Sequence, residues 1–422
     1  MTEEEGDNRT TMLALVHDPA TGGLTLSDVP MPVPTGPDEH LIQVHAVALT
    51  NGELKWPEPA AQETPIPGYE VSGTVIEAPN KSSPFQPGTE VYALTDFNRQ
   101  GNACEYAIVL TGELRQKPEA LSWEEAATVP LSALTAWQVL FVHGGLTLPT
   151  EPVTRPPTPP QIHASPPRPP SLQRQHSHPY SRQQSPASRP SSRPSSSHRP
   201  RSIVVGDDVN ANKRVLITAA AGGVGLWAVQ LARLAGVGHI TATCGPANID
   251  FVRSLGAHRV IDYTTLRNTG EASSGNRSAG TREEGGSGRN SPSTAHGRTR
   301  SSSQSRYGAF YSSSDKYDLV LDCVGGDTLK RAWTSSRHGG TVISIVMPPD
   351  KLRPETGVGM DVRGVFFIVH ADSEQLQAIT DLIETRAVKA VFDSAFQLEQ
   401  YEAAFAKVQS GHVRGKVVLR LA

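Results

Sequence analysis

The sequence predicts an α/β protein whose second half folds as a doubly wound parallel sheet. Residues 215–218 (VLIT) have the pattern of a buried parallel strand, and residues 226–236 have apolar side chains at helical spacing. A glycine-rich turn joins these two segments, and further apolar segments alternate with a helical one after them. Two segments poor in apolar residues interrupt this pattern.

These two segments are predicted to be disordered insertions, because they cannot bury enough apolar surface to offset the entropy of ordering. The first spans residues 147–212, and its central part, 151–201, holds 14 of the 34 prolines. The second spans residues 266–315 and consists mostly of Ser, Gly, Arg, Thr and Asn. The chain has a net charge of −3, and 151–201 and 266–314 carry +7 and +4, so the remainder carries −14. An acidic body is a poor partner for nucleic acid.

The insertions contain short motifs that suit protein partners. RPPTPPQIHASPPRPP (155–170) contains PxxP segments of the kind that SH3-like domains bind. QQSPAS, RNSPS and RTRSSS place Ser beside Pro or Arg, which suits kinases. Such strings arise readily in low-complexity sequence, so tolerated spacers are the alternative interpretation.

The composition also predicts a compartment. Cys104, Cys244 and Cys323 are far apart and form no CxxC motif, which is typical of a reducing environment. The first ten residues, MTEEEGDNRT, are acidic and polar, unlike a secretory or transit peptide. No apolar run of the sequence reaches membrane-spanning length. A cytoplasmic protein without a membrane partner is therefore expected.

The glycine-rich turn is the strongest functional motif. In residues 220–225 (AAGGVG), Ala220 takes the first glycine position of a dinucleotide-binding turn, and Gly222 and Gly225 take the other two. Glycines let the backbone approach a pyrophosphate, and the helix N-terminus offers amide donors. The alternative is a tight connection without a ligand. The predicted cofactor contacts here are Thr218, Ala220, Gly222, Gly223, Val224 and Gly225.

The segments after the turn complete the predicted sheet. A short helix is expected at residues 251–257, and strands are expected at 239–244, 259–263, 317–326, 339–346 and 364–369. An NAD site places an acidic residue about twenty residues after the turn, but this chain has Thr243, Cys244 and Gly245 there. The missing acid favours NADP(H), although no basic residue is present at this point either. Expected contacts to the cofactor are Thr243, Cys244, Asn248 and Tyr263, with Arg253 a more remote candidate.

Several motifs together resemble the medium-chain dehydrogenase/reductase superfamily, and most closely its zinc-free quinone oxidoreductase and enoyl reductase branch. In the second half they are AAAGGVGLWAVQLARLAG, SLGAHRVIDY, YDLVLDCVGG and SGHVRGKVVL. In the first half they are IPGYEVSGTVIEAP, FQPGTEVYAL, ACEYAIV and LSWEEAATVPLSALTAWQVLF.

The resemblance implies a GroES-like, β-rich substrate domain over residues 1–136, completed by 373–422. A Rossmann domain is expected over 137–372, with the active site in the cleft between the two. Relatives are often dimers, so a homodimer is expected by analogy.

The resemblance also implies a zinc-independent reaction. Zinc-dependent relatives carry a Gly-His-Glu motif whose His binds the metal, whereas this chain has Gly68-Tyr69-Glu70 and no Cys in residues 49–56. No metal site is therefore expected. Hydride transfer from NADPH to a quinone, or to an activated C=C bond of an enone or enoyl substrate, needs no Lewis acid.

Three catalytic candidates come from segments that match the cleft of the family. Tyr69 is expected to donate a hydrogen bond or proton, Lys55 to stabilise a developing oxyanion, and Thr135 of the LTAW motif to lie beside the nicotinamide. The alternatives are that Tyr69 only fills space and that Lys55 is a solvated surface residue. Glu53 is interpreted as structural. The resemblance adds cofactor contacts at Cys323, Val324, Gly325, Phe367, Val369, Gly415 and Lys416.

Two other functions remain open from the sequence. One is a stand-alone, trans-acting enoyl reductase of a biosynthetic pathway, which differs only in its substrate. The other is a non-enzymatic regulator or adaptor that keeps the fold and uses the insertions to bind protein or RNA partners.

Overall fold

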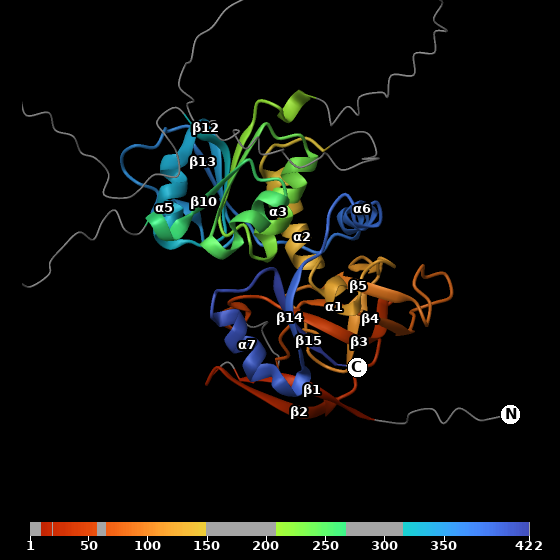
Figure 1. The fold of residues 1–422 in the computed structure, drawn as a ribbon. Coiled ribbons are helices and arrows are strands. Elements are labelled where there is room, and N and C mark those ends of the chain that lie inside the picture. The colour runs from red at the N-terminus through yellow and green to blue at the C-terminus, as the bar shows by residue number, and fades with distance from the viewer. Residues whose placement is uncertain (1–9, 19, 57–64, 149–207, 267–314, 422) are drawn as a thin grey trace, which may run out of the picture.

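A computed structural model describes residues 10–18, 20–56, 65–148, 208–266 and 315–421. The central parts of both predicted insertions, with their PxxP and Ser-rich motifs, lie outside the described residues. The described chain forms two lobes, one built on an antiparallel sheet and one on a parallel sheet (Figure 1).

The first lobe is a β-rich unit to which the end of the chain contributes two strands. Its seven-stranded sheet has the order β14-β15-β3-β4-β5-β7, and β6 pairs with β3. β15 runs antiparallel to β3, with Val417 opposite Leu49 and Val418 opposite Ala48. Its strands are β3 (Glu39–Leu49), β4 (Glu70–Glu77), β5 (Glu90–Leu94), β6 (Tyr106–Leu110), β7 (Leu114–Gln116), β14 (Phe392–Gln397) and β15 (Lys416–Arg420). A separate two-stranded sheet pairs β1 (Thr11–Asp18) with β2 (Gly23–Pro30).

The second lobe is a six-stranded parallel sheet with the order β10-β9-β8-β11-β12-β13. The strand order reverses between β8 and β11, which is the arrangement of a dinucleotide-binding Rossmann sheet. The parallel doubly wound sheet predicted from the sequence is therefore confirmed. The strands are β8 (Arg214–Ile217), β9 (His239–Cys244), β10 (Arg259–Asp262), β11 (Tyr317–Asp322), β12 (Ser336–Ser344) and β13 (Arg363–Phe366).

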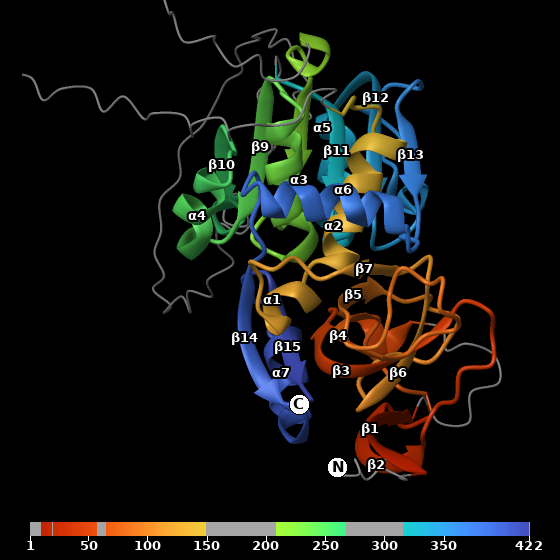
Figure 2. The same cartoon turned by 90° about the vertical axis from the view of Figure 1, so that its right-hand side faces the viewer.

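Helices cover both faces of the parallel sheet, because its strands are apolar on both sides. Val215 and Ile217 of β8 belong to the core that includes Leu226 and Val229 of α3 (Gly223–Leu234). Leu216, between them, belongs to a separate core with Trp333 of α5 (Gly326–Ser335). Figure 1 shows α3 and α5 on opposite sides of the sheet, and Figure 2 shows α6 (Ser373–Glu384) crossing the side of α3.

A long apolar helical stretch connects the two lobes. It contains α1 (Trp123–Ala127), α2 (Pro130–Trp137) and the π-helical turn η2 (Gln138–His143). Trp123–His143 is long and apolar enough to span a membrane by length and composition, which the sequence analysis did not anticipate. However, 83% of its most apolar window is buried inside the protein. Burial against α3 and α6 explains its composition, since a helix that is apolar all round belongs in a core.

The first insertion is shorter than the sequence predicted. Residues 147–148 and 208–212 belong to the folded body, because Asn210 is 2% exposed and connects both ends. Its Nδ2 atom donates to the carbonyl oxygens of Thr147 and Ala235, each at 2.8 Å. The segment that carries Asn210 lies just before β8, at the amino-terminal edge of the parallel sheet. This edge is opposite the carboxyl edge, where ligands bind.

Candidate active site

The glycine turn leaves no room for side chains at two of its positions. A Cβ atom on Gly225 would lie 2.4 Å from the Ala219 carbonyl oxygen, and one on Gly223 would lie 2.7 Å from Ser132 Oγ. Ser132 Oγ is buried and has no hydrogen-bond partner among the described residues. Helix α3 begins at Gly223, so its first backbone amides have no acceptor within the helix. This geometry fits the phosphates of a dinucleotide.

Hydrogen bonds hold the turn at the point where the strand order reverses. Thr218 Oγ1 accepts from the Cys323 amide at 2.8 Å, which connects the ends of β8 and β11. The Ala220 amide donates to the Thr243 carbonyl at 2.8 Å, which connects the turn to β9. The structure therefore brings together three of the predicted cofactor residues, Thr218, Thr243 and Cys323.

Asp322 is a positioning residue that the sequence analysis missed. Its buried carboxylate accepts hydrogen bonds from the Gly325 amide at 2.9 Å and from Ser344 Oγ at 3.0 Å. Burial raises its pKa, and these hydrogen bonds oppose that shift. Asp322 fixes the loop that carries Cys323, Val324 and Gly325. The signal was its position as the last residue of the strand, directly after the apolar run 319–321.

The remaining predicted cofactor residues lie near the carboxyl edge of the sheet. Cys244 ends β9, and Tyr263 begins η5 (Tyr263–Leu266) directly after β10. Phe367, just after β13, lies against His143 with ring centroids 4.5 Å apart, and Val369 packs against the main core. Val324 is 51% exposed.

Lys416 connects the two lobes at the glycine turn. It is the first residue of β15, and its Nζ forms an ion pair with Glu70, the first residue of β4. The same Nζ donates to Thr50 Oγ1 at 2.5 Å. A Cβ on Gly223 would lie 3.1 Å from Lys416 Cε, so the lysine lies against the start of α3. The neighbouring Gly415 donates its amide to the Ala221 carbonyl at 2.9 Å.

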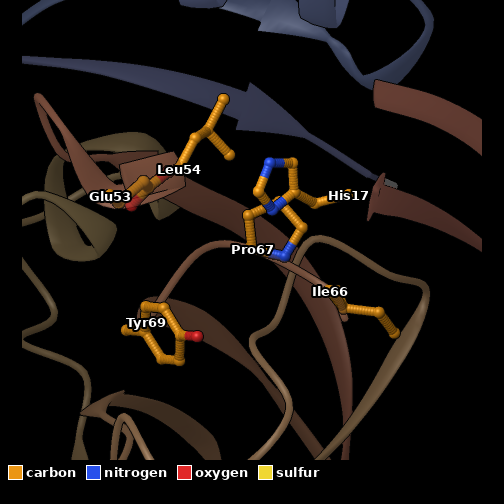
Figure 3. A pocket seen from close by; sticks show the side chains of 6 residues that line it. All are labelled: His17, Glu53, Leu54, Ile66, Pro67 and Tyr69. Carbon is orange, nitrogen blue, oxygen red and sulfur yellow. The ribbon is translucent and has the colours of Figure 1, made fainter. Parts of the chain in front are cut away.

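A small pocket lies in the first lobe, and the residue that precedes Glu70, Tyr69, lines it (Figure 3). Glu53 and Leu54 line it from η1 (Glu53–Lys55), and Ile66, Pro67 and Tyr69 line it from the segment that leads into β4. His17 at the end of β1 completes the lining. Glu53 Oε1 is buried and has no hydrogen-bond partner among the described residues. Burial raises the pKa of Glu53 to about 8, partly opposed by the positive charge of Lys416.

An aromatic cluster surrounds Tyr69. The Tyr69 and Phe97 rings meet edge to face with centroids 5.1 Å apart, and the Trp56 and Phe97 rings do the same at 5.1 Å. Trp56 and Tyr69 are 6.0 Å apart. Flat apolar faces of this kind suit a planar conjugated ligand.

The other two catalytic candidates differ in their surroundings. Lys55 is exposed and is not among the residues that line the pocket. Thr135 is buried in α2, and its hydroxyl donates to the Leu131 carbonyl of the same helix at 2.6 Å. Of the three candidates, only Tyr69 lines the pocket.

Comparison with known proteins identifies the family. Residues 36–135 match the alcohol dehydrogenase GroES-like domain, and residues 304–419 match the zinc-binding dehydrogenase domain. A probable zinc-binding oxidoreductase, mitochondrial, from Arthroderma benhamiae is 36% identical over 96% of this chain and 94% of its own length. This chain belongs to the medium-chain dehydrogenase/reductase superfamily. It is an oxidoreductase of this superfamily with a nicotinamide cofactor.

Other medium-chain dehydrogenase/reductase proteins extend the likeness over nearly the whole chain. Quinone-oxidoreductase QR1, chloroplastic, from Triphysaria versicolor is 28% identical over 97% of this chain and 98% of its own. The solved quinone oxidoreductase from Coxiella burnetii has the same fold, with a TM-score of 0.65, 21% identity and coverage of 98% and 100%. The two relatives' names give mitochondrial and chloroplastic locations, so they do not support the predicted cytoplasmic location.

The word zinc in the family names raises the question of whether this chain fits the metal. By its resemblance to the Gly-His-Glu motif, the sequence has Tyr69 where zinc-dependent relatives have the ligand His, and in the structure Tyr69 packs against Phe97 and Trp56. Among the residues that the structure describes, no group of three or more His, Cys, Asp or Glu side chains is placed to hold a metal ion. The residues present therefore do not fit the catalytic zinc of this superfamily.

Proposed function

We propose that this protein is an NADPH-dependent, zinc-independent reductase of quinones or of activated C=C bonds. One observation carries the proposal. Lys416 lies against the start of α3 while paired with Glu70, and so brings the Tyr69 segment next to the dinucleotide turn. The names of the quinone oxidoreductase relatives support the substrate class. The aromatic surroundings of Tyr69 support a planar acceptor.

The residues of this chain supply positioning and a proton. The nicotinamide cofactor supplies a hydride, and charge then develops on the conjugated oxygen of the acceptor. Hydrogen-bond donors aimed at that oxygen lower the barrier. Tyr69 and a protonated Glu53 line the same pocket and are the donors that we assign to this role.

The charge balance of the buried cluster favours a proton on Glu53. Two carboxyl groups, Glu53 and Glu70, share a single cation, Lys416. Lys416 forms its ion pair with Glu70, and Glu53 makes no ion pair of its own within the described residues, so the positive charge of Lys416 opposes the effect of burial only in part. Burial of an uncompensated carboxylate is costly, so Glu53 keeps its proton near neutral pH. Reduction of a quinone to a hydroquinone takes one hydride and one proton, and this carboxyl group can provide the proton.

The test is oxidation of NADPH by the full chain, followed by absorbance, with a panel of quinones and enones and with a simple alcohol and aldehyde as controls. We expect turnover of quinones or enones, unchanged activity after incubation with a metal chelator, and no stoichiometric zinc in metal analysis. Activity on the alcohol or aldehyde that a chelator abolishes would contradict the proposal.

A further inference from the structure

The end of β9 forms a corner that lacks a local charged residue for the cofactor. Cys244 ends the strand, and the chain continues through Gly245 and η4 (Pro246–Asn248) into α4 (Ile249–Ser254). No acidic residue lies between 243 and 249, and no basic one does either. From the local sequence alone, neither the second ribose hydroxyl of NAD nor the 2′-phosphate of NADP has a charged partner here.

The structure brings a guanidinium group to this corner from the far end of the chain. Arg414 Nε donates to Asn248 Oδ1 at 2.8 Å. Its Cζ lies 4.8 Å from the centroid of the Phe251 ring, and its own backbone amide donates to Asp393 Oδ1 at 3.1 Å. The side chain is exposed, but its contacts with Asn248 and Phe251 fix its direction.

The position of Arg414 relative to the glycine turn is also fixed. The next residue, Gly415, bridges to Gly222 and donates its amide to the Ala221 carbonyl. On the other side of the corner, a Cβ on Gly245 would lie 3.7 Å from the Tyr263 ring and hydroxyl. Arg414, Asn248 and Tyr263 therefore border the space between the pyrophosphate turn and the end of β9, where an adenosine ribose lies in this fold.

The charges around the corner leave Arg414 available for an anion. Asp250 forms an ion pair with Arg253 at 3.2 Å, and Asp393 forms one with Lys407 at 3.2 Å. The side chain of Arg414 makes no ion pair within the described residues, and both of its acceptors, Asn248 Oδ1 and the Ala247 carbonyl, are neutral. A fixed guanidinium with neutral neighbours is well suited to bidentate binding of a phosphate.

We propose that Arg414 binds the 2′-phosphate of NADP(H) and sets the cofactor preference, so that the C-terminal segment supplies the selectivity that the β9 loop lacks. Asn248 positions the guanidinium group, and Tyr263 closes the opposite side. This inference rests on the proposed function, because it assigns a residue to the same cofactor site.

The experiment measures dissociation constants of the full chain for NADPH, NADH, 2′,5′-ADP and 5′-ADP by calorimetric titration. Arg414→Gln and Arg414→Lys are compared with Arg337→Gln, which removes an exposed arginine near the start of β12 that is paired with Asp318. We expect Arg414→Gln to weaken NADPH and 2′,5′-ADP at least tenfold and to change NADH and 5′-ADP less than twofold. Arg414→Lys should give an intermediate loss, and Arg337→Gln a loss below twofold.

The outcomes separate this inference from the proposed function. A wild-type chain that prefers NADPH, with a preference that Arg414→Gln leaves intact, overturns the role of Arg414 and leaves the reductase proposal standing. Equal weakening of NADPH and NADH also overturns it, because the arginine would then act on a part common to both. A wild-type chain that binds neither dinucleotide contradicts the proposed function itself. Melting temperatures of the variants identify any loss that is due to unfolding.

Discussion

Lys416 Nζ forms an ion pair with the Glu70 carboxylate, which is completely buried, and 366 residues separate Lys416 from its second partner, Thr50. The pair joins β15 to β4 directly beside the first turn of α3. The Leu131 amide, near the start of α2, donates to the same carboxylate at 3.1 Å. The Glu70 carboxylate of β4 thus receives contacts from two other elements, β15 and α2, where the two lobes meet.

Removal of either partner of this pair should destabilise the protein strongly. Glu70→Gln leaves a buried ammonium without a countercharge, and Lys416→Met leaves a buried carboxylate, so each should cost about 3–5 kcal/mol. The double variant should cost less than the sum of the two. Unfolding in urea measures these free energies, and Lys407→Met, which breaks the more exposed pair with Asp393, should cost less than about 1 kcal/mol. Additive effects at Glu70 and Lys416 would show that the pair is not coupled.

The carboxyl group of Glu53 should make stability depend on pH. Burial raises its pKa from 4.5 to about 8, so this contribution is fully present below pH 4.5, where folded and unfolded chains both hold the proton. Between pH 4.5 and 8 only the unfolded chain releases it, and the free energy of unfolding falls by up to about 1.4 kcal/mol per pH unit. The loss is complete once the pH exceeds the folded pKa.

Glu53→Gln should remove this dependence, so that its stability relative to the wild type rises from pH 5 to pH 8. The measurement is urea unfolding at several pH values, with Glu77→Gln at an exposed carboxyl as the matched control. Parallel curves for wild type and Glu53→Gln would contradict a buried, protonated Glu53. If Glu53 supplies the proton, turnover of the wild type should also decline as the pH rises through about 8.

Tyr69→Phe should lower turnover about 10²-fold or more and leave the dissociation constant for NADPH within twofold, because only a donor to the acceptor is lost. Tyr401→Phe is the control, since its hydroxyl bonds the Leu24 carbonyl in the first lobe at 3.2 Å, away from the pocket. An unchanged rate for Tyr69→Phe would return this residue to a packing role with Phe97 and Trp56.

Gly225→Ala should destabilise the second lobe by about 1–3 kcal/mol, because the added Cβ would lie 2.4 Å from the Ala219 carbonyl oxygen. Gly222→Ala should be tolerated by the fold, since its Cβ would meet the same oxygen at 3.4 Å. Thermal unfolding distinguishes the two variants. Gly222→Ala should still weaken NADPH binding, because its methyl group would hinder the approach of the pyrophosphate. Equal stability of the two variants would disprove this account of the turn.

Much of the fold was accessible from the sequence because local patterns carry it. The strand, turn and helix around residues 215–236 follow from apolar periodicity and glycine. In the structure the strand is Arg214–Ile217, and the helix begins earlier and ends earlier than predicted, at Gly223 and Leu234. The sequence predicted the ends of the first insertion less accurately than it predicted these elements. Asn210 lies in a polar segment without periodicity, yet it is buried, because its amide group satisfies two carbonyl oxygens distant in sequence. Such long-range hydrogen bonds leave no trace in a local pattern.

The sequence by itself determined the doubly wound sheet, the dinucleotide turn and the absence of an acid after β9, because each depends on residue types within a few positions of one another. Only the tertiary structure decided which distant groups complete the site. Arg414 and Lys416 reach the glycine turn because β15 pairs with β3 across more than 350 residues of chain. Glu53, which the sequence suggested was structural, lies in the pocket beside Tyr69 because η1 follows that same strand β3. Its burial, and the pairing of Lys416 with Glu70, are properties of the packed site, and that burial raises the pKa of this carboxyl group to about 8.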